Sequence, residues 1–396
     1  MIFLFEKEKI LIFLKILTSI ALILLFLYSG AVGIFVMAIS GTNSAYFVVF
    51  AILWLEFFIL CMLLIWKRPL LKKIKTAFLA VFIVTLLGWG GVYAYEVHDD
   101  NIEVLRDRGI DLTLYEPFKE DAKVARLDKP SSLKFTEDSL PKIDSATALY
   151  PIAAAFVEAV YPKGNYAYQE QNILMQTTTR MAFNNLIEGK ADIIFASIPS
   201  QEQLETAKEK GVELHLTPIG KEGFVFFVND NNPVQELTIE QIQDIYSGKI
   251  TNWSKVGGNN EEIEAFQREK NSGSQTRLEE LMQGKELLTA PMSETRGGMG
   301  GIIRRAADYK NYKNALGFSF RYYASEMVDN KAIKLLHING IPPTKETIRT
   351  NEYPLTGQFY AITTGNHNEQ LEKFIGWILS EEGQELIEKS GYVRIK

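Results

Sequence analysis

The sequence predicts an α/β protein whose amino-terminal region forms three transmembrane helices. Two observations lead to this prediction. Three long apolar runs fill most of the first 96 residues, and from Lys142 onward short apolar strands alternate with amphipathic helices. The second pattern favours a sheet that is mostly parallel. With 396 residues, of which 47% are hydrophobic, the chain has ample material for a core.

Each apolar run is long enough to cross a bilayer as a helix. The runs extend over about 10–39, 45–66 and 76–96, and the first two contain only Lys15 and Glu56 as charged residues. A helix of about 20 apolar residues spans the hydrocarbon core. We therefore expect three spans that hold the protein in the lipid bilayer.

The charges of the connectors predict the orientation of these spans. The connector at 40–44 is uncharged, whereas the connector at 67–75 is rich in Lys and Arg, and Lys7 and Lys9 precede the first span. Lys and Arg concentrate on the cytoplasmic side of a membrane. We expect a multi-pass protein of the plasma membrane with a cytoplasmic amino terminus, and with everything after residue 96 outside the cell.

Metal, cofactor and enzyme chemistry are not indicated. The single cysteine, Cys61, lies within the second span and does not fit a lipid-attachment motif. The four histidines are scattered singly, and we find no P-loop, zinc-binding helix or nucleophile elbow. Asp192 and Glu188 form a candidate carboxylate pair, but they are explained more simply as a turn residue and a solvated helix residue. We expect no metal, no cofactor and no catalytic residues.

The segment 266–276 concentrates groups that bind anions. An apolar run ends at Phe266, and apolar residues recur at helical spacing from Leu278, so Ser272, Gly273 and Ser274 lie where a helix begins. The first N–H groups of a helix have no partner within it, and the helix dipole is positive there. Gly273 lets the backbone approach a ligand, and Arg268 offers a planar fork for two oxygens of a tetrahedral anion.

Two further strand-to-helix turns offer similar donors. Thr147 and the N–H of Ala148 belong to the first turn, and Thr178 and Thr179 belong to the second. Taken alone, the first turn is explained better by ordinary helix capping, and capping also accounts for the second. In an open α/β sheet, however, ligands bind where such turns converge at the carboxyl ends of strands. We therefore expect the three turns to share one site.

Three motifs resemble those of the phosphate-binding receptors of ABC transporters. They are Ala146-Thr147-Ala148-Leu149-Tyr150-Pro151, the stretch 245–253, and the stretch 268–276. The resemblance extends over about 144–392 and implies a two-lobed, periplasmic-binding-protein-like domain of type II. Phosphate would lie in its cleft, bound by the residues that match the family motifs: Thr147, Ala148, Thr178, Thr179, Arg268, Ser272, Gly273 and Ser274.

Composition and the resemblance together predict a division of the chain. The charged, turn-rich segment 97–140 would form a stalk and lead-in, with either a stalk or a juxtamembrane helix at 101–108. Lobe 1 would combine 141–220 with 345–396, and lobe 2 would comprise 221–344. The chain also departs from the family pattern, because Ser145 replaces a glycine and Ile198 stands where an aspartate accepts the proton of the ligand.

Several functional alternatives follow from these features. Asp144 or Glu294 could replace the missing acceptor, so the choice between phosphate and sulfate stays open. The net charge of −6 and the external location disfavour nucleic acid. The domain either delivers phosphate to ABC permease subunits or senses an anion and signals through its membrane helices or a partner. The expected cytoplasmic segments are too short for a signalling domain, which favours uptake.

Overall fold

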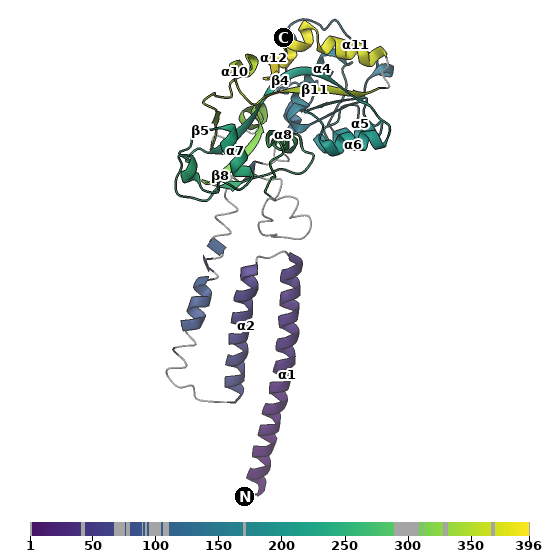
Figure 1. The fold of residues 1–396 in the computed structure, drawn as a ribbon. Coiled ribbons are helices and arrows are strands. Elements are labelled where there is room, and N and C mark those ends of the chain that lie inside the picture. The colour runs from purple at the N-terminus through teal and green to yellow at the C-terminus, as the bar shows by residue number, and fades with distance from the viewer. Residues whose placement is uncertain are drawn as a thin grey trace. The chain divides into compact units, whose positions relative to one another are not determined.

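The chain divides into two units in the computed structural model (Figure 1). The amino-terminal unit contains helices α1 (Ile2–Ser40) and α2 (Ser44–Ile65), and the second contains the elements from β1 to β12. The structure describes residues 2–40, 44–66, 76, 80–88, 90–91, 93–94, 104–105, 111–168, 172–288, 309–310, 312–327, 332–365 and 369–395.

Helices α1 and α2 pack together through aromatic side chains. Nε1 of Trp54 donates to the carbonyl of Phe26 over 3.3 Å, and Nε1 of Trp66 donates to Oγ of Ser19 over 3.1 Å. Among the described residues, one helical stretch, Lys9–Ala31, is long and apolar enough to cross a membrane, with a mean hydropathy of 2.8. The apolar part of α2, Phe50–Leu63, is shorter. The third expected span is described only in part, so a three-span arrangement stays a prediction.

The second unit is built on a sheet that extends through both lobes. Its strand order is β2-β3-β11-β4-β8-β6, and β9 and β12 also pair with β4. The strands are β2 (Ile143–Ser145), β3 (Ile193–Ala196), β4 (Leu214–Asn229), β6 (Glu264–Ala265), β8 (Ala315–Phe320), β9 (Ile333–Leu335), β11 (Thr356–Thr364) and β12 (Val393–Arg394).

The prediction of a mostly parallel sheet is wrong. Within this sheet β2–β3 and β6–β8 are parallel pairs, but β11 is antiparallel to β3 and β4, and β4 is antiparallel to β8, β9 and β12. The first part of β4 pairs with β11 up to Gly223, and its second part pairs with β8 from Phe224. The chain thus passes from one lobe to the other along β4 and returns along β11, and two strands that run in opposite directions must pair antiparallel (Figure 1).

Two short strand pairs lie outside this sheet. β5 (Glu236–Leu237) pairs with β10 (His337–Ile338), and β1 (Val104–Leu105) pairs with β7 (Tyr309–Lys310). Strand β1 falls within the segment for which the sequence allows a juxtamembrane helix. Its two residues are extended, so a helix is wrong there.

The helices of the second unit are α4 (Tyr150–Val160), α5 (Thr179–Ile187), α6 (Gln201–Glu209), α7 (Ile239–Tyr246), α8 (Gly273–Leu281), α10 (Lys345–Arg349), α11 (Glu369–Ile378) and α12 (Glu381–Lys389). Of these, α4, α5 and α8 start at or next to the three predicted turns. Local chemistry explains several starts: Ser200 and Thr238 form capping boxes with Gln203 and Gln241. Short helical turns are η1 (Leu112–Tyr115), η2 (Glu137–Ser139), η3 (Thr147–Leu149), η4 (Trp253–Val256) and a π-helical turn, η5 (Tyr323–Met327).

Separate hydrophobic cores define the two lobes. In the first core, the edge of Phe156 on α4 packs against Phe195 of β3 and Trp377 of α11. In the second core, Phe226 of β4 and Tyr246 of α7 pack around Phe318 of β8. A smaller cluster fills the space between α5, β3 and β11. Because β4 and β11 pass from one core toward the other, they form the connection between the lobes.

Candidate functional site

A buried carboxylate joins the first two candidate turns. Asp144, at the centre of β2, is fully buried and accepts four hydrogen bonds. They come from the N–H groups of Ser145 (2.7 Å) and Thr177 (3.1 Å), from Oγ1 of Thr177 (2.5 Å) and from Nδ2 of Asn185 (2.8 Å). Burial raises the pKa of Asp144, and these hydrogen bonds oppose the rise. Its oxygens are thus already occupied, and Asp144 fixes the second turn beside the first.

The first turn is held by side chains from two other segments. Oγ1 of Thr147 accepts a hydrogen bond from Nε2 of Gln176 over 2.7 Å. The hydroxyl of Tyr392, near the carboxyl end of the chain, donates to the carbonyl of Ala148. Thr147 is 9% exposed and begins η3, which leads directly into α4. The N–H groups at this helix start therefore have a fixed direction.

The second turn ends at the start of α5. Thr178 is the N-cap residue with a φ of 80°, a left-handed conformation that is costly for a β-branched residue, and its side chain is exposed. Thr179 is the first residue of α5 and is half-buried. The structure thus separates the two threonines: Thr179 is half-buried, and Thr178 lies at the surface.

The third turn meets the second at Gly273. Ser272 caps α8 by accepting a hydrogen bond from the N–H of Gln275, and Gly273 and Ser274 are buried. A Cβ placed on Gly273 would lie 3.4 Å from Oγ1 of Thr179, 3.5 Å from Cβ of Ser197 and 3.6 Å from Phe320. The starts of α5 and α8 therefore converge, together with the residue that follows β3.

Arg268 lies next to this convergence in the sequence. It is half-buried, and its N–H donates to Oε1 of Gln275 over 2.9 Å. Arg268 lines a small cavity with Phe227, Ser319 and Tyr323. This cavity is on the side of β8, so the approach of the guanidinium to the three turns stays a prediction.

The loop before α8 also contacts the opposite lobe. Oγ of Ser200, the N-cap of α6, donates to Oδ1 of Asn271 over 2.8 Å. Two ion pairs flank this bond: Lys270 with Glu202 at 2.6 Å, and Arg180 with Glu269 at 3.5 Å. The two lobes thus contact each other at the edge of the candidate site.

Comparison with known proteins identifies the domain. A family model described as a PBP superfamily domain matches residues 138–382, which is more than half of the chain. The chain belongs to the PBP superfamily. The expected two-lobed domain of this kind is thereby confirmed.

The PBP domain has relatives of stated function. The phosphate-binding protein PstS of Staphylococcus epidermidis is 29% identical over 227 residues, which cover 55% of this chain and 68% of that protein. PstS of Borreliella burgdorferi is 26% identical over 206 residues, covering 50% of this chain and 72% of that protein. An ABC-type phosphate transport receptor from Vibrio cholerae, a solved structure, matches at 25% identity with a TM-score of 0.45, covering 63% of this chain and 98% of that one.

Three residues that the sequence analysis did not select also lie at the candidate turns. Ser197 is 5% exposed, and its Oγ has no hydrogen-bond partner among the described residues. It directly follows β3, and its position at the carboxyl end of a parallel strand is a signal that could have identified it. Gln176 and Thr177 hold the turns in place, which became apparent only when their partners in space were known.

The two acceptors proposed from the sequence have different outcomes. Asp144 is saturated by its own hydrogen bonds, so it does not face a ligand. Glu294 lies outside the described residues. The described part of the chain also contains no group of three or more His, Cys, Asp or Glu residues that could hold a metal ion.

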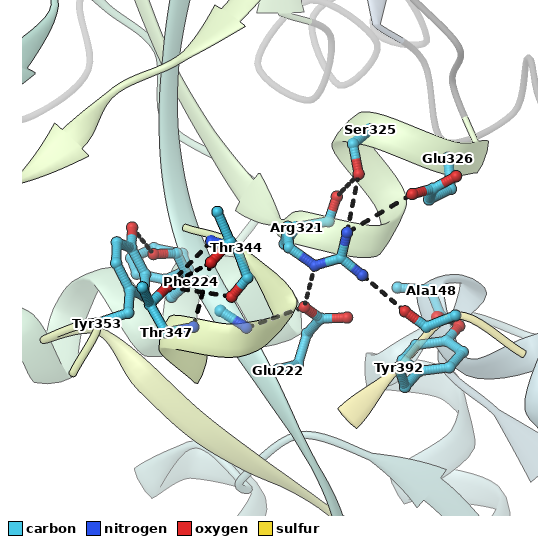
Figure 2. Close-up of polar contacts among 12 residues, drawn as sticks. Ala148, Glu222, Phe224, Arg321, Ser325, Glu326, Thr344, Thr347, Tyr353 and Tyr392 are labelled. Carbon is cyan, nitrogen blue, oxygen red and sulfur yellow. Dashed lines mark hydrogen bonds and ion pairs between the residues drawn. The ribbon is translucent and has the colours of Figure 1, made fainter. Parts of the chain in front are cut away.

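A buried ion pair lies where the lobes join (Figure 2). Nε of Arg321, which directly follows β8, is 3.5 Å from Oε1 of Glu222 on β4. Nη2 of Arg321 donates to the carbonyl of Gly391 over 2.7 Å, and Nη1 lies 3.6 Å from the exposed Glu326. The guanidinium thus joins β4 to the carboxyl-terminal segment, and the pair fixes the end of β8 at the crossing between the lobes.

Proposed function

We propose that this chain is a membrane-tethered extracytoplasmic receptor that captures inorganic phosphate for an ABC uptake system. The similarity to two PstS proteins that are named for phosphate binding supports this function. The observation that carries it is the convergence at Gly273, where the starts of α5 and α8 meet Ser197. Helix starts supply N–H donors and positive potential, which suit a tetrahedral anion.

The proposed ligand residues come from three turns of the PBP domain. Ser197 adds a hydroxyl donor at the same place. Thr178 would contribute mainly through its backbone, because its side chain is exposed. The full set is Thr147, Ala148, Thr178, Thr179, Ser197, Arg268, Ser272, Gly273 and Ser274.

The domain boundaries are part of the proposal. Lobe 1 would comprise 141–220 with 345–396, and lobe 2 would comprise 221–344. The crossing at 220/221 lies within β4, where its pairing partner changes from β11 to β8 a few residues later. Ile348 and Tyr353 pack in the core of lobe 2, so α10 would lie against the second lobe.

The membrane arrangement is also part of the proposal. Three spans with a cytoplasmic amino terminus would leave the PBP domain outside the cell, beside the permease subunits of the transporter. The helix Lys9–Ala31, which is long and apolar enough to cross a membrane, supports the first of these spans. Labelling of S139C in a C61S background with a membrane-impermeant maleimide on intact cells tests it. Labelling only after lysis would place the domain inside and contradict the proposal.

Calorimetry on the full-length protein in detergent micelles tests the ligand. Phosphate, sulfate and citrate are titrated separately into protein from which bound phosphate has been removed by dialysis. We expect heat and saturation with phosphate at a stoichiometry of one, and no binding of citrate. Absence of phosphate binding by folded protein would overturn the proposed function.

A further inference from the structure

Glu222 is a buried carboxylate with one free oxygen. It lies on β4 and is 5% exposed. Its Oε1 accepts the N–H of Gly223 over 2.9 Å and faces Nε of Arg321 at 3.5 Å. Its Oε2 has no hydrogen-bond partner among the described residues. Figure 2 shows this second oxygen on the side of Ala148 and Tyr392, away from the bonds of the first.

Glu222 borders a small cavity beside the candidate anion site. Glu222 lines a cavity of about 20 Å³ with Ala148, Ser197 and Phe320. Ser197 and Phe320 are also among the neighbours that a Cβ on Gly273 would meet. The cavity therefore adjoins the point where the starts of α5 and α8 converge. A volume of this size accommodates one water-sized group.

The chemistry of this cavity fits an OH donor. An ionised carboxylate only accepts hydrogen bonds, and a buried acceptor without a donor is costly. Hydrogen phosphate carries a proton near neutral pH, and its P–OH group can donate to Oε2. Sulfate carries no proton under these conditions, so it cannot donate a hydrogen bond to Oε2. Its oxygen and the carboxylate oxygen are both acceptors and would repel each other. The Arg321 guanidinium at Oε1 compensates part of the negative charge that a bound anion would meet.

We propose that Glu222 accepts the proton of the bound anion and thereby selects a protonated tetrahedral anion, such as hydrogen phosphate, over sulfate. This inference rests on the proposed function. Burial raises the pKa of Glu222 to about 7, with Arg321 opposing the rise, so this carboxylate accepts a proton more readily than an ordinary glutamate. Neither Asp144, which is saturated, nor Ile198 can supply this acceptor.

Selectivity is the measurement that tests this inference. The parent, E222Q and E326Q are titrated with phosphate and with sulfate at pH 8, where Glu222 is mostly ionised and phosphate still carries a proton, as full-length proteins in detergent micelles. In E222Q the amide can donate to an unprotonated oxygen. We expect a phosphate affinity lower by about tenfold or more, the loss of one charge-assisted bond, and a higher sulfate affinity. E326Q is the matched control, because Glu326 faces the same guanidinium but is exposed.

The outcomes separate this inference from its alternatives. If E222Q loses affinity for both anions in equal proportion, Glu222 acts only as a structural partner of Arg321, and the inference is overturned. Unchanged affinities for both anions would overturn it as well. If E222Q does not fold, E222D keeps the charge but retracts the carboxylate, and the ratio of phosphate to sulfate affinity must still fall. A folded parent that binds neither anion overturns the proposed function itself, and the inference with it.

Discussion

Ser200 and Asn271 connect the two lobes directly, through a hydrogen bond of 2.8 Å between their side chains. Asn271 has a φ of 67°, a left-handed conformation that asparagine tolerates better than most residues. Its carbonyl also accepts from Nε2 of Gln203 over 3.4 Å. Because Gln203 completes the capping box of Ser200, the start of α6 and the loop before α8 form one polar contact.

Removal of this contact should weaken ligand binding more than it weakens the fold. N271G deletes the side chain, and glycine adopts the left-handed conformation without strain. We expect the phosphate affinity to fall about three- to tenfold, since one net hydrogen bond of about 1 kcal/mol favours the arrangement in which the lobes meet. Calorimetry measures the affinity. N351G is the control, because Asn351 has a φ of 58° and is exposed. Equal losses in both variants would contradict the prediction.

The close approach at Gly273 allows a sharper test. A Cβ there would make ordinary contacts of 3.4 to 3.6 Å, so G273A should fold with a stability close to that of the parent. The added methyl would nevertheless occupy the space between Thr179 and Ser197. We expect phosphate binding to fall by about 100-fold or more, because the anion loses its place at two helix starts.

The control for G273A is a glycine with free space around it. Gly376 lies in α11, and a Cβ there meets nothing within 4 Å. G376A should bind phosphate like the parent and be more stable by about 0.5–1 kcal/mol, because alanine is the better helix former. Thermal unfolding measures the stability of both variants, and calorimetry measures their affinity for phosphate. If G273A binds phosphate as well as the parent, the start of α8 is not part of the phosphate site.

The predicted role of Arg268 is tested by its removal. R268A should cost about 2–4 kcal/mol of binding free energy for phosphate, because charge-assisted bonds in a partly desolvated site are lost. R349A is the control, since Arg349 forms ion pairs with Glu346 and Glu388 on the surface. An R268A protein that binds phosphate as well as R349A would show that the guanidinium remains on the β8 side.

Local patterns allowed most of the secondary structure to be predicted from the sequence. The helix starts at Thr179 and Gly273 follow from hydroxyl residues and glycine before an amphipathic run, and both were expected within a residue or two. Strand direction was not accessible in this way. The apolar pattern of β4 is the same for a parallel and for an antiparallel neighbour, so it does not indicate strand direction. The pairing of β4 with β11 also joins segments more than 100 residues apart in the chain.

The candidate site was predictable where its residues belong to one turn. Ser272 and Gly273 are adjacent in the chain, and together they form a helix-start motif, so the sequence alone was enough to select them. Glu222 could not be identified, because a glutamate in a strand is usually solvated, and its significance depends on Arg321, which lies far along the chain. For Asp144 the sequence suggested a free acceptor, whereas its hydrogen bonds to Thr177 and Asn185 are visible only in three dimensions.

The final prediction concerns the stability of the ligand-free protein as a function of pH. Burial raises the pKa of Glu222 to about 7 in the folded protein, from 4.5 for the ordinary group. The folded state therefore holds this proton more tightly than the unfolded state, and stability must fall as pH rises from about 4.5 to about 7. The charged or titratable residues beside Glu222 include Arg321, Lys345, Tyr322 and Tyr392, and Arg277 lines the same cavity.

The comparison of the parent with E222Q isolates this contribution, because the other titrating groups, including Asp144, are present in both. The two proteins should have similar stability near pH 4.5. Above pH 7 the variant should gain up to about 3 kcal/mol relative to the parent, since one pKa unit corresponds to about 1.4 kcal/mol. Urea unfolding of the phosphate-free proteins between pH 4.5 and 8 measures the difference. Parallel pH profiles would mean that Arg321 keeps Glu222 ionised throughout, and the carboxyl would then have no raised pKa in the folded state.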